Sequence, residues 1–521
     1  MQLGESSLSV IIPARNEAGT IGDVIAAAKE LRPLETIVVA NGCTDGTAAI
    51  AGRLGCVVLH YPDALGHDVG RAVGAKAAKG EILLFLDADV PIPSNELRAF
   101  LEPIVNGRAD VALNNMDPLF RRQRRPHSTT VWRQVSNALI RREDLAIDSL
   151  LSIPHAMTRK AARTIGYERL ANPCLAQLAA ASSGLRIARS RSIDVIAANR
   201  YRPEEHDAPR GSLSPSERRI AGDHLAALSV VWTDARAGFS DGGRRRDIAE
   251  RLKTGAMRLP IVSRPKLPRP STLYGGQSLS VIIPAQNEEA TIGAVIREAR
   301  KIEPAEIIVA VNGSSDRTAA IAIEEGAVVL HFPERLGNDV GRAVGAMAAT
   351  GDILLFIDAD FAIAAAQLYP YAKAVSNGID VALNDLNHYL DLRFPYNLVT
   401  ASKYAVNLAL DRKALGVGSF VAVPHAVHRS VADRIGRESF LSPVKAQVQA
   451  LLHGGVAAGC VARTEVDRMN RIRPEEHFAV SGHPPAVERI LGDHAEGISF
   501  LTKALGERGP FGPHRRNLTV L

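Results

Sequence analysis

Two pairs of aspartates stand where the chain could hold a metal ion against a phosphate. Asp87 and Asp89 follow the apolar run Ile82–Leu86, and Asp358 and Asp360 follow a nearly identical run, Ile353–Ile357. Carboxylates at the end of a buried strand contribute little to a core. Their oxygens are ligands that Mg²⁺ and Mn²⁺ prefer, and such ions usually keep positions open for substrate phosphates. The pattern therefore predicts two sites for a divalent metal, Mn²⁺ or Mg²⁺.

The aspartate pairs belong to a long internal repeat. Its motifs are spread over more than two hundred residues with almost no drift in spacing, which indicates a duplicated domain and not a short-period solenoid. The first three motifs recur 271 residues later and the last two 270 residues later: LSVIIPA at 8–14, DVGRAVGA at 68–75, RPEEH at 202–206, PHA at 154–156 and GDH at 222–224.

The repeat predicts two domains and a connection. We expect the first domain over residues 1–258 and the second over 278–521. Residues 259–277 between them are rich in proline, glycine and serine, a composition typical of a semi-rigid linker.

Within one copy, short apolar strands alternate with amphipathic helices. This order predicts an α/β fold with a mostly parallel, open, doubly wound sheet. We expect Thr20 to cap the helix that ends near Leu31, and Thr44 or Asp45 to cap the next one. Ligands of such sheets bind at the carboxyl ends of the strands, where Pro13, Asn41 and Asp87 fall. The expected strands are Leu8–Ile12, Thr36–Ala40, Val57–His60 and Ile82–Leu86, then Ser280–Ile283, Glu306–Val311, Val328–His331 and Ile353–Ile357.

Composition limits the partners and the compartment. The net charge of +6 comes from 62 basic and 56 acidic residues, which is too mild to indicate nucleic acid. The 4 cysteines show no paired spacing, so a reducing compartment is expected. No apolar run reaches the roughly 18 residues of a membrane span. We therefore expect a cytoplasmic protein, with peripheral contact to the inner face of the membrane left open.

Four motifs, in the same order in both copies, resemble glycosyltransferase family 2 with its GT-A nucleotide-sugar fold. The likeness is strong in the donor half of each copy and weak in the acceptor half. The motifs are VIIPARNE at 10–17, NGCTDGT at 41–47, GRAVGA at 70–75 and DAD at 87–89, matched by 281–288, 312–318, 341–346 and 358–360.

The resemblance implies a role for each matched residue. A nucleoside diphosphate sugar is the implied donor, with a UDP-sugar expected, and a saccharide, lipid-linked or small-molecule acceptor is implied. The metal ligands would be Asp89 and His206 in the first copy and Asp360 and His477 in the second. The donor would be bound by Pro13, Ala14, Glu17, Asn41, Arg71 and Asp87, and by Pro284, Ala285, Glu288, Asn312, Arg342 and Asp358.

The general base is left open. Inverting members of the family usually carry a Glu-Asp pair after the acceptor loop, and neither 169–187 nor 439–455 contains one. Inverting and retaining chemistry therefore both stay open. Candidates at repeated positions are His155 and His425, Glu205 and Glu476, and Asp223 and Asp493, although GDH lies in an apolar helical context that favours a structural role.

Three functions remain in competition. The first is a bifunctional glycosyltransferase with related donors and different acceptors, because the copies agree at the donor motifs and differ after 114 and 384. The second is a sugar nucleotidyltransferase, which usually needs a glycine-rich loop that PARNEAGT at 13–19 lacks. The third is a nucleotide-sugar-binding scaffold with degenerate domains. The basic runs 121–125 and 244–246 are expected on solvated faces, or against an acidic acceptor or membrane.

Overall fold

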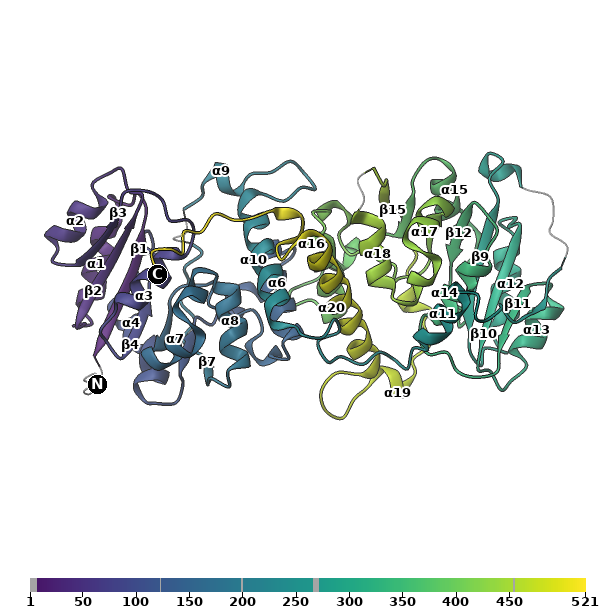
Figure 1. Ribbon diagram of the computed structural model, residues 1–521, viewed down its shortest axis with the longest axis horizontal. Coiled ribbons are helices and arrows are strands. Elements are labelled where there is room, and N and C mark those ends of the chain that lie inside the picture. The colour runs from purple at the N-terminus through teal and green to yellow at the C-terminus, as the bar shows by residue number, and fades with distance from the viewer. Residues whose placement is uncertain (1–6, 122, 198–199, 266–270, 453–454) are drawn as a thin grey trace. The chain divides into compact units, whose positions relative to one another are not determined.

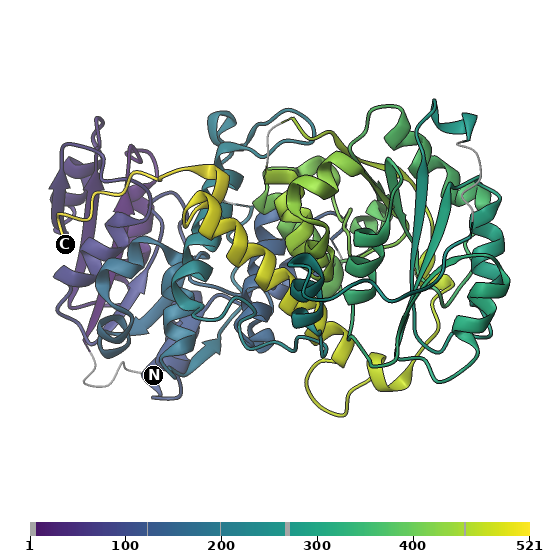
Figure 2. The same ribbon diagram turned by 45° about the vertical axis from the view of Figure 1, so that its right-hand side comes forward.

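The computed structural model describes residues 7–121, 123–197, 200–265, 271–452 and 455–521. The chain forms two compact units, and each contains one sheet with helices packed against it (Figures 1 and 2). The first unit comprises Met1–Thr233, Arg393–Pro395 and Leu505–Leu521, and the second comprises Asp234–Leu392 and Tyr396–Ala504. Residues 234–258, which were expected in the first domain, therefore lie in the second unit.

The first sheet has seven strands in the order β3-β2-β1-β4-β6-β5-β7. The first four are parallel, and β6 runs antiparallel between β4 and β5. The mostly parallel α/β fold is therefore confirmed, with one inserted antiparallel strand. The strands are β1 (Leu8–Ala14), β2 (Glu35–Asn41), β3 (Val57–Tyr61), β4 (Ile82–Phe85), β5 (Val111–Leu113), β6 (His155–Thr158) and β7 (Ile187–Arg189).

Helices cover both faces of this sheet. The described α-helices are α1 (Ile21–Lys29), α2 (Thr47–Arg53), α3 (Val69–Ala77), α4 (Ser94–Val105), α5 (Asp117–Phe120), α6 (Ser128–Leu139), α7 (Arg159–Ile165), α8 (Pro173–Ser182), α9 (Pro203–His206) and α10 (Pro215–Val231). Short 3₁₀ turns are η1 (Glu143–Leu145), η2 (Tyr167–Ala171) and, from the end of the chain, η8 (Gly509–Phe511).

The second unit repeats the plan with eight strands in the order β15-β13-β14-β12-β9-β10-β11-β8. They are β8 (Ile261–Ser263), β9 (Leu279–Ala285), β10 (Glu306–Asn312), β11 (Val328–Phe332), β12 (Ile353–Phe356), β13 (Val381–Asn384), β14 (His425–His428) and β15 (Ala458–Ala462). The α-helices are α11 (Arg246–Lys253), α12 (Ile292–Arg300), α13 (Thr318–Glu324), α14 (Val340–Ala348), α15 (Ala365–Ser376), α16 (Leu398–Ala409), α17 (Arg429–Ile435), α18 (Pro443–Leu452), α19 (Pro474–His477) and α20 (Pro485–Leu505). The 3₁₀ turns are η3 (Thr272–Tyr274), η4 (Asn387–Asp391), η5 (Lys413–Leu415), η6 (Arg437–Leu441) and η7 (Val466–Arg468).

The alternating side chains of β1 show why its sequence is apolar throughout. Val10 and Ile12 pack into the core on one face, and Ile11 packs into the core on the other. A parallel strand that is covered on both faces has no solvent side, so apolar residues run continuously.

The glycines of GRAVGA let α3 lie close to β1. A Cβ at Gly70 would stand 2.8 Å from Cβ of Pro13, and one at Gly74 would meet the Ile11 side chain. Gly341 and Gly345 face Pro284 and Ile282 in the same way. This close packing of helix on strand fixes the position of the residue after the first glycine, Arg71 or Arg342.

Two local expectations need correction, and the structure selects between the alternatives of a third. The Thr20 side chain makes no cap hydrogen bond and instead donates to the carbonyl of Ala88, at 2.9 Å. Of the two caps proposed for α2, Asp45 is the one whose Oδ1 accepts the Thr47 amide, at 3.0 Å. Part of the expected linker is structured, because β8 pairs antiparallel with β11; its residues 266–270 lie outside those described.

Candidate functional site

A cavity of about 640 Å³ opens at the carboxyl ends of β1 and β4 in the first unit. The expected donor and metal residues converge there, as the sheet topology requires. Its lining includes Pro13, Ala14, Glu17, Asn41, Arg71, Asp87, Asp89, Glu205 and His206.

Arg71 and Asp87 form an ion pair in the lining of this cavity. Arg71 is 7% exposed. Its Nη2 lies 3.2 Å from Oδ1 of Asp87, and its Nη1 lies 3.2 Å from Oδ1 of Asp68, just before α3. In the second unit Arg342 makes the same pairs, at 2.9 Å to Asp358 and 3.1 Å to Asp339. Two carboxylates thus fix each guanidinium near the first turn of a helix.

Arg202 was not singled out from the sequence, yet it bridges two acids of the site. Its Nη2 lies 3.0 Å from Glu17 and 2.8 Å from Asp89. Arg473 matches it, at 2.8 Å from Glu288 and 3.2 Å from Asp360. Its place as the first residue of the repeated RPEEH was the available signal.

The acids of the cavity crowd one another. Burial, followed by the charge of Asp89, raises the pKa of Glu17. Burial also raises the pKa of Asp87, and Arg71 offsets this only in part. In the second unit burial raises the pKa values of Glu288 and Asp360. A cation bound among these carboxylates would offset both the burial of their negative charge and the repulsion between them.

The side chains present fit a metal ion that takes some of its ligands from the protein and the rest from a bound substrate. Among the residues described, no three His, Cys, Asp or Glu side chains converge to hold a metal without other ligands. Mg²⁺-type sites commonly use one or two carboxylates and complete the shell with phosphate oxygens and water. Asp89 and Asp360, with side chains 13% and 8% exposed, offer such carboxylates.

Asn41 lines the cavity with its amide already engaged. Its Nδ2 donates to the carbonyl of Gly66, at 3.1 Å, and its Oδ1 accepts the Leu65 amide, at 2.6 Å. Asn312 makes the equivalent bonds to Gly337 and Leu336. The side chain therefore holds the loop that precedes α3.

His206 and Glu205 reach the cavity from α9. Nδ1 of His206 accepts the Arg202 amide at 2.9 Å, which leaves Nε2 for another partner. Glu205 pairs with Arg219 at 2.6 Å. His477 and Glu476 repeat both contacts, with Arg473 and Arg489. The hydrogen bond of the histidine and the ion pair of the glutamate therefore fix the shape and position of the short helix in each RPEEH motif.

His155 is not among the residues that line the cavity, and His425 is its counterpart in the second unit. Each begins the inserted antiparallel strand, stacks on a phenylalanine, Phe85 or Phe356, and points Nδ1 at a backbone carbonyl. Burial lowers the pKa of both imidazoles to about 3. An imidazole with so low a pKa is a weak base, which favours a packing role for PHA.

These two histidines predict an acid-sensitive fold. Their folded pKa values lie below the unfolded value of about 6.5, so the unfolded chain binds more protons between pH 3 and 6.5. The free energy of unfolding should therefore fall as the pH drops through this window, by about 2 kcal/mol per imidazole between pH 7 and 5. Urea titrations across pH should show a flatter profile for His155→Gln with His425→Gln. Equal slopes in the double variant and the unmodified chain would contradict the assignment.

Asp223 and Asp493 are buried and bind arginines, so neither is a free base. Each lies 2% exposed on α10 or α20. Arg516 pairs with Asp223 at 2.7 Å, and Arg244 pairs with Asp493 at 2.6 Å. The side chain of Arg244 is 0% exposed. The basic run 244–246 is therefore only partly a solvated face, contrary to the expectation; residue 122 of the other run lies outside those described.

Two mostly parallel sheets, each with acids and an arginine at the carboxyl ends of its central strands, define a pair of GT-A domains. The family model of glycosyl transferase family 2 matches residues 9–164 and 280–436, so the chain belongs to that family.

Known relatives align with only part of the chain. AglD, a glycosyltransferase of Haloferax volcanii, is 31% identical over 26% of this chain and 23% of its own length. Glucosyl-3-phosphoglycerate synthase of Mycobacterium tuberculosis is 38% identical over 16% of this chain and 29% of its own. The chain thus spans less than a third of either relative.

Among solved structures, that of the same synthase in complex with UDP is similar to this chain. The alignment spans 46% of this chain and 83% of the synthase chain, with 20% identity and a TM-score of 0.33. A further structure of it holds Mn²⁺, UDP-glucose and phosphoglyceric acid, at the same TM-score of 0.33. Within the described residues, no helix combines the length and apolarity needed to cross a membrane.

Proposed function

We propose that each repeat is a metal-dependent glycosyltransferase domain with its own donor site for a nucleoside diphosphate sugar, most simply a UDP-sugar. One observation carries the proposal: the arginine on the helix after β3 or β11 pairs with the first aspartate of DAD in both units, at 3.2 and 2.9 Å. An arginine beside carboxylates at the carboxyl edge of an α/β sheet suits a diphosphate with a bound cation.

The roles of the side chains follow from the charge that develops in the reaction. When the sugar leaves, negative charge grows on the diphosphate, and Arg71 or Arg342 would donate hydrogen bonds to it. Asp89 with His206, and Asp360 with His477, would hold the divalent cation, which supplies Lewis-acid stabilisation of the same charge. Pro13, Ala14 and Glu17, with Pro284, Ala285 and Glu288, would border the base and ribose.

Different acceptors are proposed for the two repeats, because the segments after β5 and β13 differ in structure as well as sequence. The first forms helix α5, where Arg121 binds Asp117 at 2.6 Å. The second forms the 3₁₀ turn η4, which includes His388 and Tyr389. Side chains of such different charge and shape would recognise different acceptor groups.

Glu205 and Glu476 are the candidates we retain for proton transfer, since Glu205 lines the cavity and Glu476 repeats its ion pair. The pKa of Glu205 is lowered: burial raises it, and Arg219 more than offsets that rise. Such a carboxylate stays ionised at neutral pH and can accept a proton, although its basicity is modest.

A donor screen tests the proposal. The purified chain with Mn²⁺ should release UDP from at least one UDP-sugar, slowly by hydrolysis and faster once an acceptor is supplied. Chelation with EDTA should stop the release, and Mn²⁺ should restore it. UDP binding without turnover of any nucleotide sugar would instead indicate a scaffold, and release of pyrophosphate from a nucleoside triphosphate would indicate a nucleotidyltransferase.

A further inference from the structure

Each unit contains a segment that follows the last helix of the other repeat. The C-terminal arm, residues 506–521, follows α20 but belongs to the first unit, and the central arm, residues 234–245, follows α10 but belongs to the second. Figures 1 and 2 both show the yellow C-terminal arm beside the purple strands of the first unit. Aligned 272 residues apart, Arg508 matches Arg236 and Arg516 matches Arg244.

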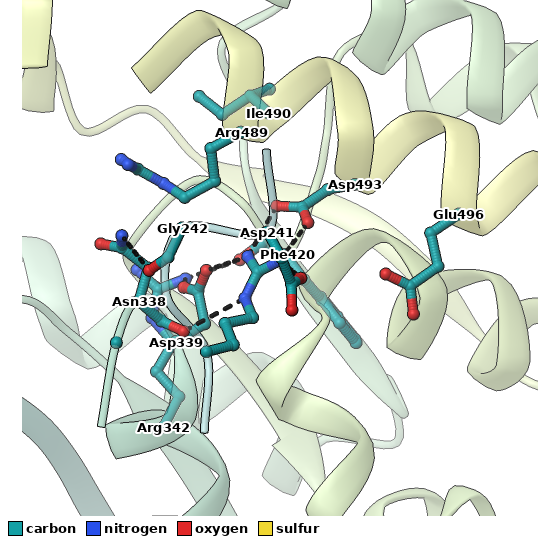
Figure 3. Close-up of polar contacts among 12 residues, drawn as sticks. Asp241, Gly242, Asn338, Asp339, Arg342, Phe420, Arg489, Ile490, Asp493 and Glu496 are labelled. Atoms are coloured by element: carbon teal, nitrogen blue, oxygen red, sulfur yellow. Dashed lines mark hydrogen bonds and ion pairs between the residues drawn. The ribbon is translucent and has the colours of Figure 1, made fainter. Parts of the chain in front are cut away.

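Both arms are anchored on the aspartate of GDH. Arg516 makes a two-pronged contact with Asp223, with Nη1 2.9 Å from Oδ1 and Nη2 2.7 Å from Oδ2. Arg244 binds Asp493 in the same way, with Nη1 2.6 Å from Oδ1 and Nη2 2.9 Å from Oδ2. The second arginine of each arm, Arg508 or Arg236, binds the same carboxylate. Figure 3 shows the cluster around Asp493 and Asp339 in the second unit.

Both arms also bind the backbone of the loop before α3 or α14. The amide of Asn517 donates to the carbonyl of Leu65 at 2.7 Å, and Nε of Arg516 donates to that of His67 at 3.3 Å. In the second unit the Arg245 amide donates to Leu336 at 2.7 Å, and Nε of Arg244 to Asn338 at 3.1 Å. These hydrogen bonds tie each loop to its arm.

Glycines in these loops leave room for the arms. Gly66 and Gly337 have positive φ angles of 102° and 80°. A Cβ on Gly66 would collide with the carbonyl oxygen of Arg515, and one on Gly337 with that of Gly243. Neither backbone carbonyl can move aside as a flexible side chain could. Both loops thus have space for an arm at the same position.

In each unit, an aspartate just before α3 or α14 lies between the arm arginine and the arginine assigned to the diphosphate. Gly66, His67 and Asp68 line the cavity. In the second unit Arg244 lies 2.7 Å from Asp339, which lies 3.1 Å from Arg342. In the first unit Arg516 lies 3.9 Å from Asp68, which lies 3.2 Å from Arg71.

We propose that Arg516 and Arg244 are positioning residues for the donor sites: each holds the loop and the aspartate that orient Arg71 or Arg342. The segment after the second repeat thereby completes the first donor site, and the segment after the first repeat completes the second. This inference rests on the proposed function, because it concerns the same donor sites. Its distinctive consequence is that a change near the C-terminus weakens the N-terminal site and spares the other.

The test uses the full chain and UDP with Mn²⁺ as the probe. Asp360→Asn reports the first site alone, and Asp89→Asn reports the second site alone. Arg516→Ala and Arg244→Ala are made in both backgrounds and titrated by calorimetry. Arg515→Ala and Arg251→Ala are the matched controls, since each removes an exposed arginine, from the C-terminal arm and from α11. Hydrogen exchange of residues 65–71 and 336–342 is measured on the same proteins.

Arg516→Ala should raise the UDP dissociation constant about tenfold at the first site alone, the size of effect typical of groups that orient a ligand-binding residue. Arg244→Ala should do the same at the second site alone. Exchange should quicken only in the loop of the affected site. Arg516→Lys keeps the positive charge but not the planar fork, so its effect should be intermediate.

Unchanged UDP affinity in Arg516→Ala and Arg244→Ala, with binding intact in the parent chains, would overturn the arm proposal and leave the proposed function standing. Faster exchange without loss of affinity would reduce the arms to a structural role and overturn it too. Equal weakening of both sites by one substitution would point to general destabilisation and would also overturn it. Failure of the unmodified chain to bind UDP would sink the donor-site assignment itself, and the arm proposal with it.

Discussion

Replacing Asp89 and Asp360 together by asparagine should reduce sugar release from the preferred UDP-sugar by about 100-fold or more. The loss follows from removing one carboxylate from each cation site while the diphosphate still needs its charge stabilised. Each single replacement should silence one site, so its acceptor is no longer glycosylated while the other acceptor still is. Initial rates with each acceptor measure this directly.

Asp23→Asn is the matched control for that substitution. Asp23 is exposed on α1, away from the cavity lining. It should change neither rate by more than about twofold, as expected for a surface position. Full activity of the Asp89→Asn, Asp360→Asn chain with Mn²⁺ present would contradict the assignment of these acids to a metal.

Replacing Arg71 by methionine should weaken UDP binding at the first site by about 30-fold. The lost interaction is a charge-assisted hydrogen bond to the diphosphate, worth roughly 2 kcal/mol when removed. Methionine keeps most of the length of the side chain within the same buried space, whereas the charge disappears. Arg342→Met should act in the same way on the second site, and calorimetric titration with UDP measures both.

Lys76→Met provides the comparison for Arg71→Met, because it removes one positive charge from the exposed face of the same helix. Its UDP affinity should stay within about twofold of the unmodified chain, since exposed charges are screened by salt. Because Arg71 also neutralises Asp68 and Asp87, the thermal midpoint of Arg71→Met should be recorded too. Equal UDP affinities in the two variants would contradict a diphosphate contact for Arg71.

The strands, and the edge of the sheet where the candidate donor residues meet, were predictable because their signals are local. Continuous apolar runs mark β1 and β4, and the acids and GRAVGA motif follow those strands in sequence. Parallel strands bring their carboxyl ends to one edge, so the sequence was enough to predict that Pro13, Asn41 and Asp87 would meet. Duplication strengthened each prediction, because a motif that occurs twice at one spacing rarely arises by chance.

The missed features depend on contacts between distant residues. Arg202 binds Glu17 across 185 residues of sequence, and apart from its place in the repeated RPEEH nothing in the sequence distinguishes it from a solvated arginine. Arg244 sits in a run of three arginines that resembles a surface patch, yet its partner Asp493 lies 249 residues further on. The antiparallel strand β6 has only four residues, too few for a clear period of two.

The most direct test of two donor sites is a calorimetric titration of the unmodified chain with UDP in the presence of Mn²⁺. We expect two equivalents of UDP per chain, with one lost in Asp89→Asn, the other lost in Asp360→Asn, and none bound when both are replaced. A single equivalent that disappears with only one of the two substitutions, or no binding at all, would contradict the presence of a donor site in each repeat.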